Sequence, residues 1–328
     1  MAKRMGVQVN EFAICMGPAI FKKQVGETTY SLRCIPIGGY CAMDGEDEDS
    51  DNPRAFSRAK AWKRLLILVA GAFMNFLTGF LVLILLYSFA AGFSTPKISG
   101  FMEGSTISQE TGLQAGDELY RIDGKRVYIY SDISMLLSRN TSGNYHLEVK
   151  RDGKITDLGT VTMTPREFTV DGQTQHTYGL NFSAEKNTVG RTLRTAWYTS
   201  VDFARMVWMG LGDLISGLVG VENMSGPVGI VSVMAQTGKA SATFLDALMN
   251  IAYFGAFLAI NLAVMNMLPL PALDGGRAFF LVITAAIEAI THKKLNPKYE
   301  GYIHAAGMLL LLAFIAFVTF KDILKLFA

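Results

Sequence analysis

One segment of the chain combines a long apolar stretch, helix breakers and an isolated carboxylate. It runs from Asn261 to Arg277 and reads NLAVMNMLPLPALDGGR. Asp274 ends the apolar stretch, where a carboxylate is costly unless it is solvated, paired or bound to a cation. Pro269 and Pro271 break the helix just before it, and the two following glycines permit close packing or unusual backbone angles. This pattern favours a functional site at Asp274; an exit turn capped by the aspartate has the same residue types.

The elements that carry this segment are predicted membrane spans. Of 328 residues, 50% are hydrophobic and 18% are charged, whereas a soluble domain carries about 25% charge. The apolar residues form blocks: 65–91 and 247–273 hold no charge, and 303–320 holds one histidine. Each block meets the requirement of roughly 18–20 residues for crossing the hydrocarbon layer. We therefore predict a multi-spanning α-helical membrane protein rather than a soluble enzyme.

Composition also excludes other classes. The 21 Phe and 12 Tyr are too many for a disordered chain, and a net charge of +2 gives no general case for nucleic-acid binding. Three Cys without CxxC spacing indicate neither a disulfide scaffold nor a thiolate metal site. Residues 1–64 are too polar to contain the apolar core of a signal peptide.

Basic residues predict the orientation. Arginines and lysines crowd 54–64, just before the first span, and the loop after the second span is also basic. Because Lys and Arg accumulate in cytoplasmic loops, both segments are placed inside and 92–246 outside. Lys321 and Lys325 argue weakly against an outside C-terminus.

Two non-helical regions are expected. Residues 7–43 alternate imperfectly and are punctuated by glycines, which predicts strands that form a small cytoplasmic hairpin or contact the membrane. The acidic stretch 44–53 has no metal-ligand spacing and is interpreted as a solvated linker.

In the outer region, the Asp123-Gly124 and Asp152-Gly153 turns predict two hairpins. The run GLQAGDELYRIDGKRV around the first turn resembles a PDZ domain, which binds peptides at an open sheet edge.

Several motifs, in register over essentially all 328 residues, resemble the bacterial site-2 proteases. These are NxxPxPxLDGG at the end of the second span, SGPVGI at 225–230, AGAFMNF at 70–76, PIGGY at 36–40 and the PDZ-like region between two spans. The resemblance is to RIP zinc metalloproteases of the regulator of sigma-E protease (RseP) type. Ala72 departs from the family, which often has Pro there.

The resemblance implies roles for named residues. Asp274 matches the third protein ligand of a catalytic Zn²⁺, and Asn266, Pro269 and Pro271 match the substrate-holding motif before it. Gly71 and Asn75 match a pair on one face of the first span; Asn75 is equally well explained as a hydrogen-bonded packing residue. The segment containing Gly38 and Gly39 corresponds to a membrane-re-entrant β loop that pairs with an unwound substrate strand.

The family's HExxH motif, which supplies two zinc ligands and the general base, does not occur in the sequence. Of the four histidines, His146 and His176 are predicted outside, His292 lies in a basic loop, and His304 is expected to be interfacial or packed rather than a ligand. The family pattern HExxHFxxAKxxGV would put Met1 just after the motif. We therefore hypothesise a truncated gene model and expect the chain by itself to be inactive.

The implied function is intramembrane cleavage of the transmembrane segments of regulatory membrane proteins. Expected substrates are single-span proteins resembling anti-sigma factors, or remnant signal peptides, cut after an upstream site-1 protease. The expected location is the bacterial cytoplasmic (inner) membrane, with contact to the lipid bilayer, an extracytoplasmic PDZ domain and no nucleic-acid partner. A non-catalytic membrane protein that binds through its PDZ domain is the alternative.

The predicted domains follow in order along the chain. They are a cytoplasmic-side re-entrant β segment and basic linker (1–64), a transmembrane helix (65–91), a β-rich PDZ domain with short helices (92–190), interfacial or extracytoplasmic helices (191–246), a transmembrane helix with the NxxPxPxLDGG motif (247–276), a cytoplasmic loop or helix (277–302) and a transmembrane helix (303–320).

Overall fold

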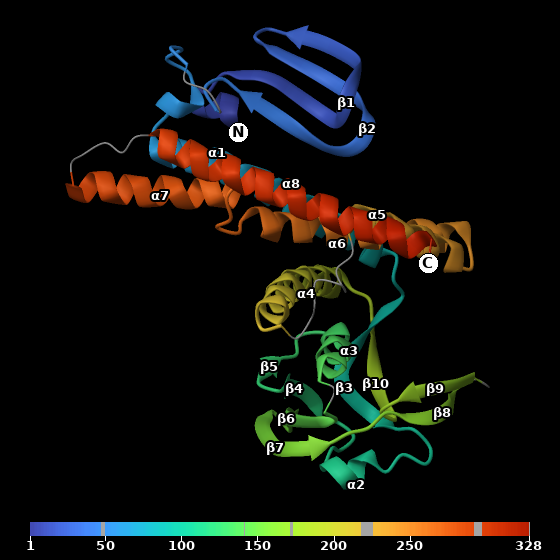
Figure 1. The fold of residues 1–328 in the computed structure, drawn as a ribbon. Helices are drawn as coiled ribbons and strands as arrows, with labels where there is room; N and C mark the ends of the chain where they lie inside the picture. The colour runs from blue at the N-terminus through green and yellow to red at the C-terminus, as the bar shows by residue number, and fades with distance from the viewer. Residues whose placement is uncertain (47–49, 141, 171–172, 218–225, 292–296, 328) are drawn as a thin grey trace. The chain divides into compact units, whose positions relative to one another are not determined.

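The polypeptide divides its contacts between two units that interleave along the sequence. The first comprises 1–78, 210–251 and 258–328, and the second comprises 79–209 and 252–257. Figure 1 shows the elements of the computed structural model. The residues that the structure describes are 1–46, 50–140, 142–170, 173–217, 226–291 and 297–327.

Within the described residues, three helices are long and apolar enough to cross a membrane. They are α1 (Ala61–Ser88), α6 (Phe244–Asn266) and the stretch Gly301–Leu324 of α8 (Pro297–Phe327), with mean hydropathies of 2.3, 1.8 and 2.3. Only 22%, 17% and 6% of their most apolar windows are buried within the protein. Most of their apolar side chains therefore face outward, as expected for helices solvated by lipid.

The helix after the second apolar block ends earlier than the predicted 247–276. Helix α6 ends at Asn266, and after the loop 267–273 a new helix, α7 (Asp274–Thr291), begins. Proline has no amide hydrogen and clashes with the preceding helical turn, so Pro269 and Pro271 prevent α6 from continuing. Asp274 thus lies at the start of a helix rather than at the end of one.

The N-terminal strands form a sheet of their own in the first unit. Strand β1 (Val9–Val25) pairs with β2 (Thr28–Met43), and the turn between them contains Gly26 at φ 63°. Residues 11–14 of β1 pair both with 39–42 and with 29–32 of β2. The two bent strands therefore supply four segments, and the first half of β1 lies inside the sheet (Figure 1).

A small apolar cluster joins the N-terminus to the helices of the first unit. The cluster combines residues from the single-turn helices η1 (Ala2–Met5) and η2 (Phe56–Arg58) with residues of β1, α1 and α7. Its buried members are Ala2, Val7, Val9, Phe56, Leu68, Ala278 and Leu281. Burying these side chains ties the start of the β sheet to α1 and α7. Helix α5 (Pro227–Ala240) also belongs to this unit and packs on α8.

The second unit contains the predicted outer β region. Its sheet has the order β10-β3-β4-β6-β7, with β5 paired to β4, and β8 pairs with β9 separately. The elements are β3 (Gly92–Phe101), α2 (Ile107–Thr111), β4 (Glu118–Ile122), β5 (Lys125–Arg126), α3 (Tyr130–Arg139), β6 (Asn144–Arg151), β7 (Lys154–Thr162), β8 (Arg166–Val170), β9 (Gln173–Thr177) and β10 (Leu180–Lys186).

Both predicted hairpin turns occur in this unit. Asp123 and Asp152 have φ 49°, and the glycines that follow them have φ 73° and 79°. Two consecutive residues at positive φ are what a tight two-residue hairpin requires. The turns join β4 to β5 and β6 to β7.

A hydrophobic core lies under the sheet of the second unit. Fully buried residues such as Ile98, Leu113, Leu147 and Val149 come from its strands and loops, and α3 contributes Leu136. Helix α4 (Val189–Ile215) follows the last strand. Its small and polar residues, including Thr192, Ala196, Thr199, Ser200 and Asp202, are buried, whereas Leu193, Trp197 and Trp208 are exposed.

Candidate active site

The break between α6 and α7 forms a short, strained loop. Leu270 N–H donates to Leu268 O at 2.7 Å, and Leu273 N–H donates to Leu270 O at 3.3 Å. Ala272 has φ 78°, in the left-handed region that residues with a Cβ rarely adopt. Its N–H donates to His304 Nδ1 of α8 at 3.1 Å. The His304 side chain of α8 therefore supplies the hydrogen-bond acceptor for a backbone N–H in the loop before Asp274.

The two glycines after Asp274 allow α7 to begin against this loop. A Cβ on Gly275 would lie 2.4 Å from Leu268 O, and a Cβ on Gly276 would lie 2.0 Å from Leu270 O. Neither glycine has positive φ, so the helical conformation itself does not require glycine. Close approach of backbone to backbone requires it.

Asp274 is half-buried and faces α1. A Cβ placed on Gly71 would lie 3.6 Å from Asp274 Oδ2, so the carboxylate lies next to the α1 backbone at a residue without a side chain. Asp274 also lies in the first turn of α7, where unpaired N–H groups and the helix dipole favour negative charge. The structure thus brings together Asp274 and Gly71, two residues that the sequence motifs singled out.

The other predicted site residues have more varied surroundings. Asn266 is the last residue of α6 and is half-buried, as is Asn75 of α1. Pro269 is exposed. Pro271 packs against α8, where a Cβ on Gly307 would lie 2.3 Å from Pro271 Cβ. The roles of these residues stay predictions.

Gly38 and Gly39 lie on one segment of the N-terminal sheet. Residues 39–43 pair with β1 on one side, and no other strand in the described part of the chain pairs with this segment. A Cβ on Gly39 would lie 2.7 Å from Ala13 O, so glycine permits the strands to approach closely there. Gly38 has φ 65°, a left-handed conformation that suits glycine.

Hydrogen bonds of charged side chains stabilise this sheet. Arg33 donates to Glu11 Oε1 at 2.7 Å and to Gly17 O at 2.6 Å, and Ser31 Oγ donates to the same carboxylate oxygen at 2.6 Å. Hydrogen bonds from Ser31 and Arg33 lower the pKa of Glu11 to about 2. The carboxylate therefore stays ionised and holds Arg33 across the bend of the sheet.

The acidic stretch 44–53 makes specific polar contacts and is more than a solvated linker. Glu46 is partly buried, and its Oε1 lies 2.8 Å from Arg277 Nη1 in the first turn of α7. The pair links the end of the β sheet to the helix that begins with Asp274. The stretch 47–49 of the same predicted linker lies outside the described residues.

Sequence reasoning missed a second isolated acid, at the end of α8. Asp322 is buried, and its Oδ2 accepts hydrogen bonds from Gly226 and Gly229 N–H, both at 2.8 Å. It therefore caps the start of α5 from another helix. A Cβ on Gly226 would lie 2.9 Å from the same oxygen, which explains a glycine in the SGPVGI motif. An acid ending an apolar helix was the available signal, as it was for Asp274.

The second unit holds a buried cluster of two carboxyl groups and one guanidinium. Arg205 Nη1 lies 3.2 Å from Asp132 Oδ1 and 3.1 Å from Asp202 Oδ1. Asp132 Oδ2 also accepts the N–H groups of Tyr128 and Ile129. Burial raises the pKa of Asp202 first, hydrogen bonding and repulsion from Asp132 raise it further, and Arg205 only partly opposes them. Asp202 is therefore the member that holds a proton.

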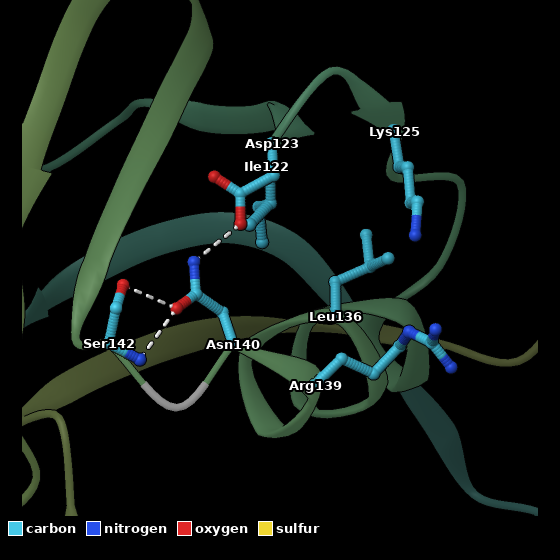
Figure 2. Close-up of a pocket in the computed structure, with 7 residues that line it drawn as sticks. All are labelled: Ile122, Asp123, Lys125, Leu136, Arg139, Asn140 and Ser142. Carbon is cyan, nitrogen blue, oxygen red and sulfur yellow. Dashed lines mark hydrogen bonds between the residues drawn. The ribbon is translucent and has the colours of Figure 1, made fainter. Parts of the chain in front are cut away.

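A surface cavity of about 350 Å³ in the second unit has no sign of hydrolytic chemistry. Figure 2 shows its lining, with Asn140 between Asp123 and Ser142. Asn140 Nδ2 donates to Asp123 Oδ2 at 2.9 Å, and Ser142 Oγ donates to Asn140 Oδ1 at 2.7 Å. The polar groups on this side of the cavity bind one another and stabilise the loop after α3.

The described residues supply one candidate zinc ligand rather than a complete site. A hydrolytic zinc needs three protein ligands and one open position. Among the described residues, no three His, Cys, Asp or Glu side chains lie close enough together to hold a metal ion. His304 Nδ1 already accepts the Ala272 N–H, and His292 lies outside the described part. Asp274 could serve as one zinc ligand, but it does not form a three-ligand metal site with the described residues around it.

Fold and site together define a class: a membrane protein with several apolar helices, a β-rich portion and a carboxylate at a broken helix. The sequence profile of peptidase family M50 matches residues 1–314. The chain therefore belongs to peptidase family M50, the site-2 protease family, as the motifs predicted.

Similar proteins cover nearly the whole chain. The zinc metalloprotease CPE1693 of Clostridium perfringens is 33% identical over 99% of this chain and 92% of its own length. The zinc metalloprotease FN1322 of Fusobacterium nucleatum is 34% identical, with 99% and 93% covered. The regulator of sigma-W protease RasP of Bacillus subtilis is 26% identical, with 100% and 94% covered. The names of the Clostridium perfringens and Fusobacterium nucleatum relatives identify Zn²⁺ as the metal of the family.

Proposed function

We propose that this protein serves intramembrane proteolysis of regulatory membrane proteins, with Asp274 at the reaction centre. One observation carries the proposal. The Asp274 carboxylate is held at the start of α7, beside the side-chain-free Gly71 of α1, in a member of a zinc metalloprotease family. A strained loop, two close-packed glycines and the Glu46–Arg277 pair hold that carboxylate in place.

The N-terminal sheet is the proposed substrate-binding element. Its segment with Gly38 and Gly39 has a partner strand on one side only, within the described residues. An extended peptide binds such an edge through main-chain hydrogen bonds. A substrate helix must unwind before cleavage, because helical packing shields its peptide carbonyls. Asn266, Pro269, Pro271 and Asn75 are proposed to contact the unwound segment.

The proposed substrates are single-span proteins that resemble anti-sigma factors, or remnant signal peptides, cut after a site-1 protease. The Bacillus subtilis relative supports this class through its name, regulator of sigma-W protease. The proposed location is the bacterial cytoplasmic membrane, with the β-rich unit acting as a PDZ domain on the outer side. Within the described residues its sheet ends at β10 and β7 without a further partner strand, and the unit lies between α1 and α6 in the sequence; both features support this role.

The metal chemistry of the family cannot be completed by the described residues. Bound zinc would supply Lewis-acid activation of water and carbonyl, and Asp274 is one donor where three are needed. We therefore propose that the other ligands and the general base come from elsewhere in the functional enzyme, and that the 328-residue chain has no hydrolytic activity by itself.

A second candidate is a non-catalytic membrane protein that binds transmembrane or peptide segments. The observation in its favour is the same incomplete donor set among the described residues. Its binding elements would be the PDZ-like unit and the edge of the N-terminal sheet. It differs from the protease in predicting neither zinc binding nor peptide-bond cleavage by the natural protein.

The test uses natural protein purified from its host membranes. Zinc content, intact mass and cleavage of a single-span reporter are measured for wild type and for Asp274→Ala, with Asp246→Ala in the first turn of α6 as a control. The protease predicts stoichiometric zinc, a mass above that of the 328-residue chain, and cleavage that only Asp274→Ala abolishes. Zinc-free protein of 35.9 kDa that binds but does not cut the reporter would establish the alternative.

A further inference from the structure

His304 makes a contact that places it next to the candidate site without being part of it. It lies on α8, and its Nδ1 accepts the N–H of Ala272 at 3.1 Å. Ala272 lies two residues before Asp274 and has φ 78°. A non-glycine residue in this conformation is strained, because its Cβ lies too close to the following carbonyl oxygen. The conformation persists only if the surroundings hold it.

Two further contacts fix the imidazole and the loop against each other. The Phe280 ring of α7 meets His304 edge-on, with ring centroids 5.4 Å apart and an interplanar angle of 77°. One turn further along α8, Gly307 allows contact with Pro271, since a Cβ there would lie 2.3 Å from Pro271 Cβ. The loop is therefore held by packing at Pro271 and by a directional hydrogen bond at Ala272.

The hydrogen bond also defines the chemical state of the ring. An imidazole nitrogen accepts a hydrogen bond only when it carries no proton, so His304 must be neutral with its hydrogen on Nε2. Asparagine can place an acceptor oxygen close to the position of Nδ1, whereas leucine fills similar space with no acceptor. Comparing the asparagine and leucine variants therefore separates the effect of the hydrogen bond from the effect of side-chain volume.

We propose that His304 is a positioning residue: its hydrogen bond holds Ala272 in the left-handed conformation and so directs the Asp274 side chain toward Gly71 of α1. Only Leu273 separates Ala272 from the start of α7, so rotation at Ala272 would swing the first turn of α7. The proposal that this matters for proteolysis rests on the proposed function of Asp274; the positioning itself does not.

The experiment measures loop geometry rather than activity. Full-length variants carry Gly71→Cys and Asp274→Cys, with the three native cysteines replaced by serine, and oxidative cross-linking between positions 71 and 274 is followed by gel mobility. In cysteine-free protein, hydrogen–deuterium exchange is measured for peptides that include Ala272. Each assay compares His304 with His304→Leu and His304→Asn.

His304→Leu is expected to slow cross-linking at least fivefold and to speed Ala272 exchange about tenfold, as loss of one hydrogen bond of ordinary strength implies. His304→Asn should retain most of both properties. If His304→Leu lowers overall stability, adding Ala272→Gly should restore cross-linking, because glycine adopts positive φ without the bond. Unchanged cross-linking and exchange in His304→Leu, or an equal defect in His304→Asn, would overturn the proposal.

These outcomes are independent of the proposed function. If Asp274→Ala leaves reporter cleavage intact, the protease proposal fails, yet the cross-linking and exchange results still decide the role of His304. Conversely, normal geometry in His304→Leu refutes the positioning role even if Asp274 proves essential. In the natural protein, a positioning role further predicts that His304→Leu lowers kcat more than it raises KM, and that His304→Asn restores kcat.

Discussion

Replacing Gly276 with alanine should destabilise the protein, although helix propensity alone predicts the opposite. Gly276 is the third residue of α7 and does not have positive φ. Alanine in a helix interior is favoured over glycine by roughly 0.8–1 kcal/mol. A Cβ on Gly276, however, would lie 2.0 Å from Leu270 O and 2.7 Å from Leu270 C. Both atoms belong to the backbone and cannot rotate away.

The size of the effect follows from that distance. Real Cβ atoms essentially never approach another heavy atom closer than 3.0 Å, so α7 and the loop must separate by about 1 Å. Overpacking of this kind costs about 1–3 kcal/mol, and rigid neighbours place the cost in the upper part of that range. After the gain in helix propensity, we expect a net loss of about 1–2 kcal/mol.

Thermal unfolding in detergent, followed by tryptophan fluorescence, measures this loss as a Tm lower by a few degrees. Gly255→Ala is the matched control, because Gly255 lies inside α6 and a Cβ there would meet nothing within 4 Å. We expect that variant to be neutral or slightly more stable. The packing explanation for the LDGG motif is refuted if Gly276→Ala matches Gly255→Ala in Tm.

Three further predictions concern charged side chains. Asp322→Ala removes the acceptor of two backbone hydrogen bonds and should lower the free energy of unfolding by about 2 kcal/mol. The Tm of Asp322→Asn should lie between those of Asp322→Ala and wild type. If Asp322→Ala and wild type have equal Tm values, the capping role is contradicted. Because the folded-state pKa of Asp202 is raised, the unfolded chain loses that proton first as pH rises above about 4, so stability falls toward alkaline pH. Asp202→Asn should flatten this slope, by up to about 1.4 kcal/mol per pH unit in chemical denaturation, and an unchanged slope would contradict the assignment. The Glu46–Arg277 pair is partly exposed, so a double-mutant cycle with Glu46→Gln and Arg277→Gln should give a coupling below about 1 kcal/mol; a much larger value would contradict this weak pairing.

Local features of this protein could be predicted because their physical causes are local. An apolar stretch of sufficient length favours lipid whatever the rest of the chain does, and the three apolar helices lie where the uncharged blocks predicted them. The Asp-Gly pairs at 123 and 152 specify tight turns through their own backbone preferences. Pro269 likewise ends α6 through the covalent structure of proline.

The environment of the candidate site depended on contacts between distant residues. Ala272 and His304 are 32 positions apart, and Glu46 and Arg277 are 231 positions apart. Periodicity and spacing describe one element at a time, so they could not show which helix satisfies the loop. They described His304 as an interfacial or packing residue and the Glu46 segment as a linker, and both side chains proved to make specific polar contacts.

The sequence by itself determined the family, the apolar helices, the hairpin turns and the isolation of Asp274, because each follows from residue types along a short stretch or from motifs in order. Only the tertiary structure decided that Asp274 begins a helix beside Gly71, that His304 binds the strained residue before it, and that Asp322 caps α5. The physical reason is that hydrogen bonds and close backbone contacts act over about 3 Å, and packing alone selects which distant residues come that close.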